Sequence, residues 1–339
     1  MLTKSLNHQI QHRMELIANN NARSMVLNHR EVVKSTSTNF IEANTEKVTL
    51  EHLKEKCTIP VFAKDNETTI SHYQFINETL DVIKSQFPNT QTVMPDIRVS
   101  HVVKGRIPSA IGKPAKELLD HEKTIYYERC AFVIELPQFK QVINGNELGL
   151  CIGGVRAYNQ ENLYSKKSLE KFKMFVGYQN KVCTNLCIST DGFTNEIRIG
   201  SILDLNQNIQ NLLSLYDMDN HLIKLEAMSN YELTEEQFGH LVGKARMFQH
   251  LSKTEQQGIF PLLLNDSQIN NVVKEYYNCP NFKRSKDGNI NMWNLYNLFT
   301  EANKSSYIDS NFERNVNTYQ YVNHLVESLK NDSGSYYII

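Results

Sequence analysis

The side chains of this sequence that could do chemistry are, above all, cations that could neutralise phosphates, and they gather in two segments. Residues 96–116 hold five Lys and Arg side chains against one acid, a net charge of +4. Residues 156–173 hold five cations against two acids, a net charge of +3. Tyrosines lie in or beside both segments. Cations interleaved with aromatic rings on which bases can stack are what sequence-tolerant binding of single-stranded nucleic acid requires.

These two segments supply the predicted binding residues, with cations on phosphates and tyrosines against bases. The predicted contacts are Arg98, Lys104, Arg106, Lys113, Tyr126, Tyr127, Arg156, Tyr158, Tyr164, Lys166 and Lys167. The alternative is that the cations form an ordinary solvated surface and that the tyrosines are half-buried packing residues.

Carboxylates and histidines offer a second interpretation, a metal-assisted enzyme acting on phosphodiesters or nucleotides. It would use Glu122, Glu128 and Glu135 with His101 or His121. The spacing matches no H-E-x-x-H signature, because no ligand lies four residues after His121. Motifs of P-loop, dinucleotide-binding and α/β-hydrolase enzymes are missing as well. No catalytic residue, metal ligand or cofactor is therefore predicted, and a non-enzymatic protein is favoured.

Cysteines and asparagines are weaker candidates. Cys183 and Cys187 are separated by three residues and have no second pair at metal spacing, so we interpret them as buried thiols. Asn180, Asn185 and Asn297 could fix a ligand, although bonds from their side chains to nearby backbone explain them equally well.

An acidic stretch gives a third interpretation, a protein-interaction factor. Residues 217–236 hold six acids against one Lys, a net charge of −5, while the whole chain carries only −1. A protein partner would be met through this acidic helical half.

Composition and length point to a globular protein with a sizeable core. The 339 residues are 40% apolar and 22% charged. No run of about 18 apolar residues predicts a membrane span, and the first residues do not have the pattern of a signal peptide. We therefore expect a cytoplasmic protein that does not enter a membrane; the oligomeric state stays open.

The pattern of elements predicts an α+β fold. Residues 1–45 are predicted to be a loosely ordered leader. Residues 46–200 are predicted to form an α+β core, with a mostly antiparallel sheet and helices on one face. Residues 201–339 are predicted to be a helical domain or layer.

Strand signals end near residue 200. Asn144-Gly145 is a strong hairpin signal that should join strands 138–143 and 147–156. The other predicted strands are 57–63, 97–104, 124–137, 172–182 and the short stretches 186–190 and 196–201.

Helix signals occur on both sides of the sheet segments. Ser71 and Thr234 are predicted to cap helices, Thr234 with Gln237 as a capping box. A loop and helix are expected over 108–121, with Leu118 and Leu119 facing inward. The other predicted helices are 50–56, 203–225, 266–276, 291–304 and 316–330.

Several segments carry a family resemblance. The sequences IPVFAKDNETTISHYQFI (59–76), GRIPSAIGKPAKELLDHEKTIYYER (105–129), GGVRAYNQENLYSKKS (153–168), CTNLCISTDGF (183–193) and NLYNLFTEANKSSYI (294–308) resemble domain of unknown function 3871 over roughly residues 45–330. The V-C-x-N element at 182–185 and the N-L-F-T-E element at 297–301 are more distantly similar to the phage- and plasmid-like domain of unknown function 932. The resemblance implies a bacterial mobile-element or phage setting and supplies no catalytic residues. Together with the basic and aromatic segments and the missing catalytic motifs, this setting favours a protein that handles single strands in replication or recombination.

Overall fold

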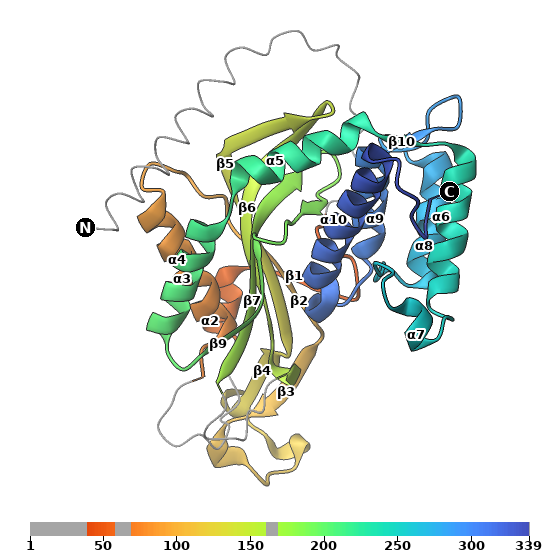
Figure 1. Cartoon of the computed structure of the whole chain (residues 1–339). Helices are drawn as coiled ribbons and strands as arrows, with labels where there is room; N and C mark the ends of the chain where they lie inside the picture. The colour runs from red at the N-terminus through yellow and green to blue at the C-terminus, as the bar shows by residue number, and fades with distance from the viewer. Residues whose placement is uncertain (1–38, 58–68, 161–168, 339) are drawn as a thin grey trace.

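The computed structural model describes residues 39–57, 69–160 and 169–338 of the chain. In these ranges an antiparallel sheet stands at the centre, and helices lie on both of its sides (Figure 1). The predicted α+β class is confirmed: the N-terminal half is mostly antiparallel sheet, and helices dominate after it.

The central sheet has strand order β1-β2-β5-β6-β7-β8, with β9 also paired to β7. All of these neighbours run antiparallel. The strands are β1 (Glu46–Val48), β2 (Asp96–Val99), β5 (Arg129–Ile143), β6 (Asn146–Ala157), β7 (Glu170–Asn180), β8 (Leu186–Cys187) and β9 (Phe193–Ile199).

A two-residue turn joins the longest strands, β5 and β6. Asn144 and Gly145 have φ angles of 47° and 76°, in the left-handed region that Gly and Asn adopt at low cost. Ile143 pairs with Asn146 directly across the turn. The predicted hairpin is therefore confirmed.

Three helices lie on one face of the sheet (Figure 1). They are α2 (Leu50–Glu55), α3 (His72–Gln86) and α4 (Ile202–Leu215). α3 begins at Ser71, whose hydroxyl accepts from the Gln74 N–H while the Gln74 side chain accepts from the Ser71 N–H. The Phe75 ring of α3 then packs edge-on against Phe132 and Phe172 of the sheet, at centroid distances of 5.1 and 4.7 Å.

α10 and α9 lie on the opposite face, α8 and α6 lie farther out, and α5 crosses from the end of α4 towards them (Figure 1). α10 contacts β5, β6 and β8, and its Phe312 ring lies 4.6 Å from that of Phe175 in β7. α9 packs between α10 and α8, and α8 in turn contacts α6. The elements are α5 (Met218–Ala227), β10 (Glu232–Leu233), α6 (Glu235–Phe248), α7 (Lys253–Gln256), α8 (Asp266–Asn278), β11 (Ile290–Asn291), α9 (Met292–Asn303) and α10 (Ile308–Lys330).

One apolar core runs across residue 200. Phe75 of α3, Tyr178 of β7, Leu205 of α4 and Trp293 of α9 belong to the same buried cluster. The helices after residue 200 therefore pack as layers on the sheet. The predicted boundary at residue 200 stays a prediction.

The described end of the predicted leader is packed against the body. Phe40 and Ile41 are buried with Phe312 in a second cluster between the sheet and α10. The backbone N–H groups of Glu42 and Ala43 donate to the carbonyl of Lys304 at 2.8 and 3.1 Å. Residues 39–43 thus belong to the core, and residues 1–38 lie outside the described ranges.

Two helix boundaries differ from the predictions. The helix predicted over 203–225 is two helices, because Asp217 caps α5 by accepting from the Asn220 N–H and the chain turns at that point. α10 begins at Ile308, well before the predicted residue 316. Its first turns place Ile308, Phe312 and Val316 in the cluster between the sheet and α10, and polar residues fill the positions between them, so the helical pattern is weak in the sequence. The predicted capping box of Thr234 and Gln237 is confirmed, whereas the strand predicted over 57–63 lies outside the described residues except for Cys57.

In the parts of the chain that the structure describes, no helix combines the length and apolar character needed to cross a bilayer.

Two buried histidines predict how stability depends on pH. Burial lowers the pKa of His72 to about 3, with the Arg156 guanidinium adding to the effect, and burial also lowers the pKa of His221 to about 3. The unfolded chain binds protons on these side chains below about pH 6.5, whereas the folded chain does not. We expect the free energy of unfolding to fall as pH drops from 6.5 towards 3, by up to about 1.4 kcal/mol per pH unit for each histidine.

Urea denaturation at several pH values between 7 and 4.5 measures this slope. His221→Gln should remove about one histidine's share, whereas His250→Gln, at an exposed position, should leave the slope unchanged. An unaltered slope in His221→Gln would contradict the buried neutral imidazole.

Candidate functional site

A two-stranded arm extends from the central sheet and carries a net positive charge. It consists of β3 (Val102–Arg106) and β4 (Lys123–Tyr127) with the tip between them, and it reaches past the helices at the lower end of the molecule (Figure 1). We call residues 102–127 the arm. Five Lys and Arg side chains against three acids give it a net charge of +2.

The arm continues the pairing of β2 with β5. Val99 pairs with Cys130 and Val102 with Tyr127, so two residues lie between the two pairs on each strand. Between them, the Ser100 N–H donates to the Arg129 carbonyl at 3.0 Å, and the Arg129 N–H donates to the Ser100 hydroxyl at 3.1 Å. The strands predicted over 97–104 and 124–137 are therefore two halves of one long hairpin, each divided where the hairpin leaves the sheet.

Cross-strand register gathers cations on one face of the arm. Lys104 lies opposite Ile125, and Arg106 lies directly opposite Lys123. Residues directly opposite in an antiparallel pair, and those two apart on one strand, share a face, so all three cations project from the same side. Like charges in direct opposition destabilise a hairpin unless an anion comes between them.

Hydrogen bonds and ion pairs preform the tip of the arm. The Lys113 ammonium pairs with the buried Glu122 carboxylate, which also accepts from the Leu119 N–H at 2.9 Å. These two bonds hold the pKa of the Glu122 carboxyl below its usual value. The Arg106 guanidinium donates to the Lys113 carbonyl, and Lys123 pairs with Asp120 at 2.7 Å.

The helix expected over 108–121 is not formed. The segment holds three single turns, Pro108–Ala110, Ala115–Glu117 and Asp120–Glu122. Leu119 is exposed and Leu118 is half-buried, so the expected inward face is absent. A short helix needs an apolar surface to pack against, and a projecting arm offers none.

Four of the predicted nucleic-acid contacts are buried and contact other residues of the protein. Arg98 donates to the carbonyl and hydroxyl oxygens of Thr45. Arg156 is 0% exposed, between the rings of Tyr158 and Phe172 at 4.6 and 4.5 Å. Arg156 also pairs with the Glu170 carboxylate and donates to the Ile70 carbonyl.

The tyrosines at the base of the arm are likewise engaged. The Tyr127 carbonyl accepts from His72 Nε2 at 2.8 Å, and its hydroxyl lies 3.0 Å from His52 Nε2. Tyr158 is buried, and Tyr126 is half-buried with its ring 6.4 Å from that of Tyr158. Placing Arg98, Arg156, Tyr127 and Tyr158 on an exposed binding surface was therefore wrong, because internal partners already satisfy these side chains. Tyr164, Lys166 and Lys167 lie outside the described residues.

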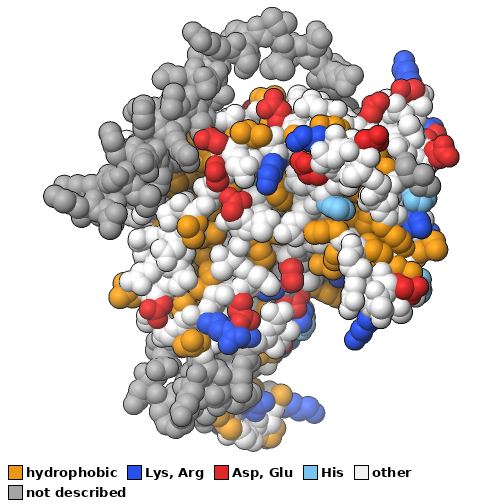
Figure 2. All heavy atoms as spheres, in the orientation of Figure 1, with side chains coloured by type: hydrophobic (Ala, Val, Ile, Leu, Met, Phe, Trp, Pro, Cys, Tyr) orange, Lys and Arg blue, Asp and Glu red, His pale blue; other side chains and the backbone are white. Residues whose placement is uncertain are grey.

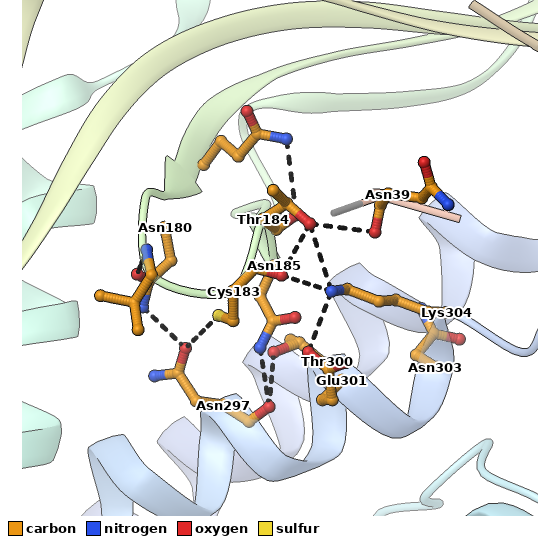
Figure 3. A network of polar contacts seen from close by, with 12 residues as sticks. Asn39, Asn180, Cys183, Thr184, Asn185, Asn297, Thr300, Glu301, Asn303 and Lys304 are labelled. Atoms are coloured by element: carbon orange, nitrogen blue, oxygen red, sulfur yellow. Dashed lines mark hydrogen bonds and ion pairs between the residues drawn. The ribbon is translucent and has the colours of Figure 1, made fainter. Parts of the chain in front are cut away.

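A second notable site is a buried set of polar contacts between the sheet and α9, which we call the polar lock (Figure 3). Asn297 stands at its centre, and its side-chain oxygen accepts from Asn180 Nδ2 at 3.0 Å. Asn297 Nδ2 donates to the Trp293 carbonyl, and the Asn297 carbonyl accepts from Asn185 Nδ2, both at 2.9 Å. Each polar group of the Asn297 side chain is thereby used, as burial requires. The lock comprises Asn180, Cys183, Thr184, Asn185, Asn297, Glu301 and Lys304.

Lys304 supplies a buried charge to the polar lock. Its side chain is 1% exposed, and its ammonium pairs with Glu301 at 2.9 Å and donates to the Cys183 carbonyl. Thr184, whose hydroxyl also accepts from Lys304 at 3.2 Å, has a φ of 59°, an unusual value for a β-branched residue. Lys304 therefore connects α9, the turn before β8 and, through its own carbonyl, residues 42 and 43.

The comparisons with known proteins give one match. The family model described as "Domain of unknown function, B. Theta Gene description (DUF3871)" matches residues 21–338. The chain belongs to this family. No curated protein matches the chain, and no solved structure does.

In this member of the family, two separated sequence elements meet in the polar lock. They are the V-C-x-N element at 182–185 and the N-L-F-T-E element at 297–301, more than 110 residues apart. Asn185 and Cys183 of the first element both contact Asn297 of the second. Because these bonds are internal, the polar lock holds the sheet against α9, and its polar atoms are used in bonds within the protein.

The carboxylates of the enzyme interpretation are held separately by local cations. Glu122 pairs with Lys113 in the arm, and Glu135 pairs with Lys181 within the sheet. Glu128 lies 3.8 Å from Arg129. His101 and His121 are exposed. The described residues contain no group of three or more side chains placed to hold a metal ion together.

The acidic stretch and the cysteine pair occupy different environments. Glu235 pairs with Arg284 at 2.7 Å and accepts from the Tyr277 hydroxyl, so part of the acidic charge over 217–236 is already matched. Cys183 and Cys187 are both buried, and burial raises the pKa of the Cys187 thiol to about 12. A thiol with so high a pKa is a poor nucleophile at neutral pH.

The polar lock predicts a large loss of stability when Asn297 is replaced. Asn297→Leu keeps the approximate size of the side chain but leaves Asn180 Nδ2 buried without its acceptor. We expect the free energy of unfolding to fall by about 2–4 kcal/mol. Urea denaturation at pH 7 measures it, with Asn211→Leu on the exposed side of α4 as the matched control, expected within about 0.5 kcal/mol of the parent. A loss in Asn297→Leu no larger than that of the control would refute a stabilising role for the lock.

Proposed function

We propose that this protein binds nucleic acid through the arm, by contacts to phosphates and without strong sequence preference. The observation that carries the proposal is the register of the arm, which sets Lys104, Arg106 and Lys123 on one face. A row of cations two residues apart on a strand repeats at about 6.8 Å. This spacing is close to that of successive phosphates in an extended strand, so a single strand is the expected ligand.

The charge balance of the arm supports the same ligand class. The whole chain has a net charge of −1, whereas the arm alone has +2. Lys104 and Lys116 are exposed and have no ion pair among the described residues. Hydrophobic side chains and Lys and Arg side chains appear together at the lower end of the face shown in Figure 2, where Figure 1 draws the arm. Release of counterions from a phosphate backbone would then supply the binding free energy.

Stacking on tyrosines contributes less to the proposal than cations do. Of the predicted tyrosine contacts that the structure describes, only Tyr126 is more than slightly exposed. Binding therefore depends mainly on phosphate contacts and should be strongly salt-dependent. A role in replication or recombination of a mobile element fits such a ligand and the distant resemblance of the 182–185 and 297–301 elements.

Replacing the cations of the arm tests the proposal. In the triple variant Lys104→Ala, Arg106→Ala, Lys123→Ala, three phosphate contacts are lost. Because each phosphate on a single strand contributes about −0.7 to the slope of log affinity against log salt, we expect the slope to flatten by roughly 2. Fluorescence anisotropy with a labelled oligonucleotide, titrated between low and moderate salt, gives both the affinity and the slope.

A charge-matched variant provides the control. Lys224→Ala, Lys253→Ala, Lys330→Ala removes three exposed cations from α5, α7 and α10. It changes the net charge equally and should retain the parent slope. Equal slopes in the two triple variants, or no binding by the parent at micromolar concentration, would overturn the proposal.

A further inference from the structure

The tip of the arm presents an exposed isoleucine. Ile111 is 77% exposed, more than any other large hydrophobic side chain in the described residues, and Leu119 of the same tip is 55% exposed. Both lie in the segment between β3 and β4, among the cations of the arm. Single exposed hydrophobics are common on protein surfaces, so the environment of Ile111 must decide whether it has a role.

The backbone of the tip holds Ile111 outward. The Ala110 N–H donates to the Ile107 carbonyl at 3.0 Å, the Lys113 N–H donates to the Ala110 carbonyl at 3.2 Å, and Ala110 is buried. Gly112 follows with a φ of 93°, a conformation that favours glycine. The turn therefore exists before any ligand binds, and it places a stiff, β-branched side chain at the apex.

We propose that Ile111 enters between two neighbouring bases of the nucleic acid that the arm holds, and separates that base step. The inference rests on the proposed function. Cations of the arm would engage the phosphates, and the apolar surface of a nucleic acid is its stacked bases, which lie beside those phosphates. Apolar side chains flanked by cations act in this way where proteins wedge base steps apart.

The energetics separate this role from simple affinity. Unstacking a base step costs free energy of the same order as burial of an isoleucine side chain gains, so the two effects nearly offset each other. Removing Ile111 should therefore change the dissociation constant by less than about tenfold. The base step itself should remain stacked in the variant complex.

An oligonucleotide containing 2-aminopurine reports the base step directly, because its fluorescence is quenched by stacking. The full-length protein is titrated into the single strand and, separately, into its duplex, while anisotropy records binding. We expect a rise in 2-aminopurine fluorescence on binding. The titration in which the fluorescence rises, single strand or duplex, identifies the form of nucleic acid whose base step is separated. Ile111→Ser should abolish the rise at saturating protein and leave the affinity within tenfold. Ile111→Phe should retain it.

Leu203→Ser is the matched control, because Leu203 is 67% exposed on α4. It should behave as the parent in both measurements. Absence of an anisotropy change would overturn the proposed function, and this inference with it. Binding without a fluorescence rise in either form, or a rise that persists in Ile111→Ser, would overturn the inference alone.

Discussion

The backbone pairing of one long hairpin determines where the charges of this protein lie. β2 and β3 pair with β5 and β4 without a change of register, from the core of the sheet to the arm. Within the sheet, that register buries Ile97 and Val99 under α3. A slip of one residue would turn both away from that cluster and would turn Lys104 to the opposite face of the arm. Packing in the core therefore fixes the charge pattern of a segment that has little core of its own.

Buried polar contacts join the central sheet to the segment before α3 and to α9. Arg156 and Glu170 join β6 to β7 and reach the backbone before α3. The polar lock does the same between the sheet and α9, with Asn297 bridging side chains more than 110 residues away in sequence. Buried polar groups are costly unless satisfied, so such networks favour one arrangement of layers over others. A rigid body of this kind is what a projecting arm needs if its cations are to keep their spacing.

Local patterns in the sequence predicted the parts of the fold that depend on local chemistry. Asn144-Gly145 can adopt the turn that a two-residue hairpin needs. Ser71 and Thr234 each cap a helix by bonds to a residue three positions later. The proposed binding surface was harder to predict from the sequence, because burial of an arginine depends on distant partners. Arg98 is satisfied by Thr45, and Arg156 by Ile70, 86 residues away. A signal was nevertheless present, since Arg98 lies between the apolar residues Ile97 and Val99 of β2.

The helix expected over 108–121 fails for a related physical reason. Its sequence has acceptable helix formers after Pro114. The segment nevertheless projects away from the body, where no apolar surface could stabilise a helix by packing. Ion pairs and single turns order it instead, with Glu122 as the acceptor that draws Lys113 and Leu119 together. The result is a preformed tip, which propensity alone could not reveal.

Crosslinking shows most directly whether nucleic acid lies along the arm. A single-stranded oligonucleotide carrying photoreactive bromodeoxyuridine would be irradiated with the full chain, and the attached peptides identified by mass spectrometry. If nucleic acid lies along the arm, crosslinks will form to peptides within residues 102–127 and will be lost at high salt. Crosslinks confined to the helices after residue 200, above all to the acidic stretch 217–236, would contradict that placement.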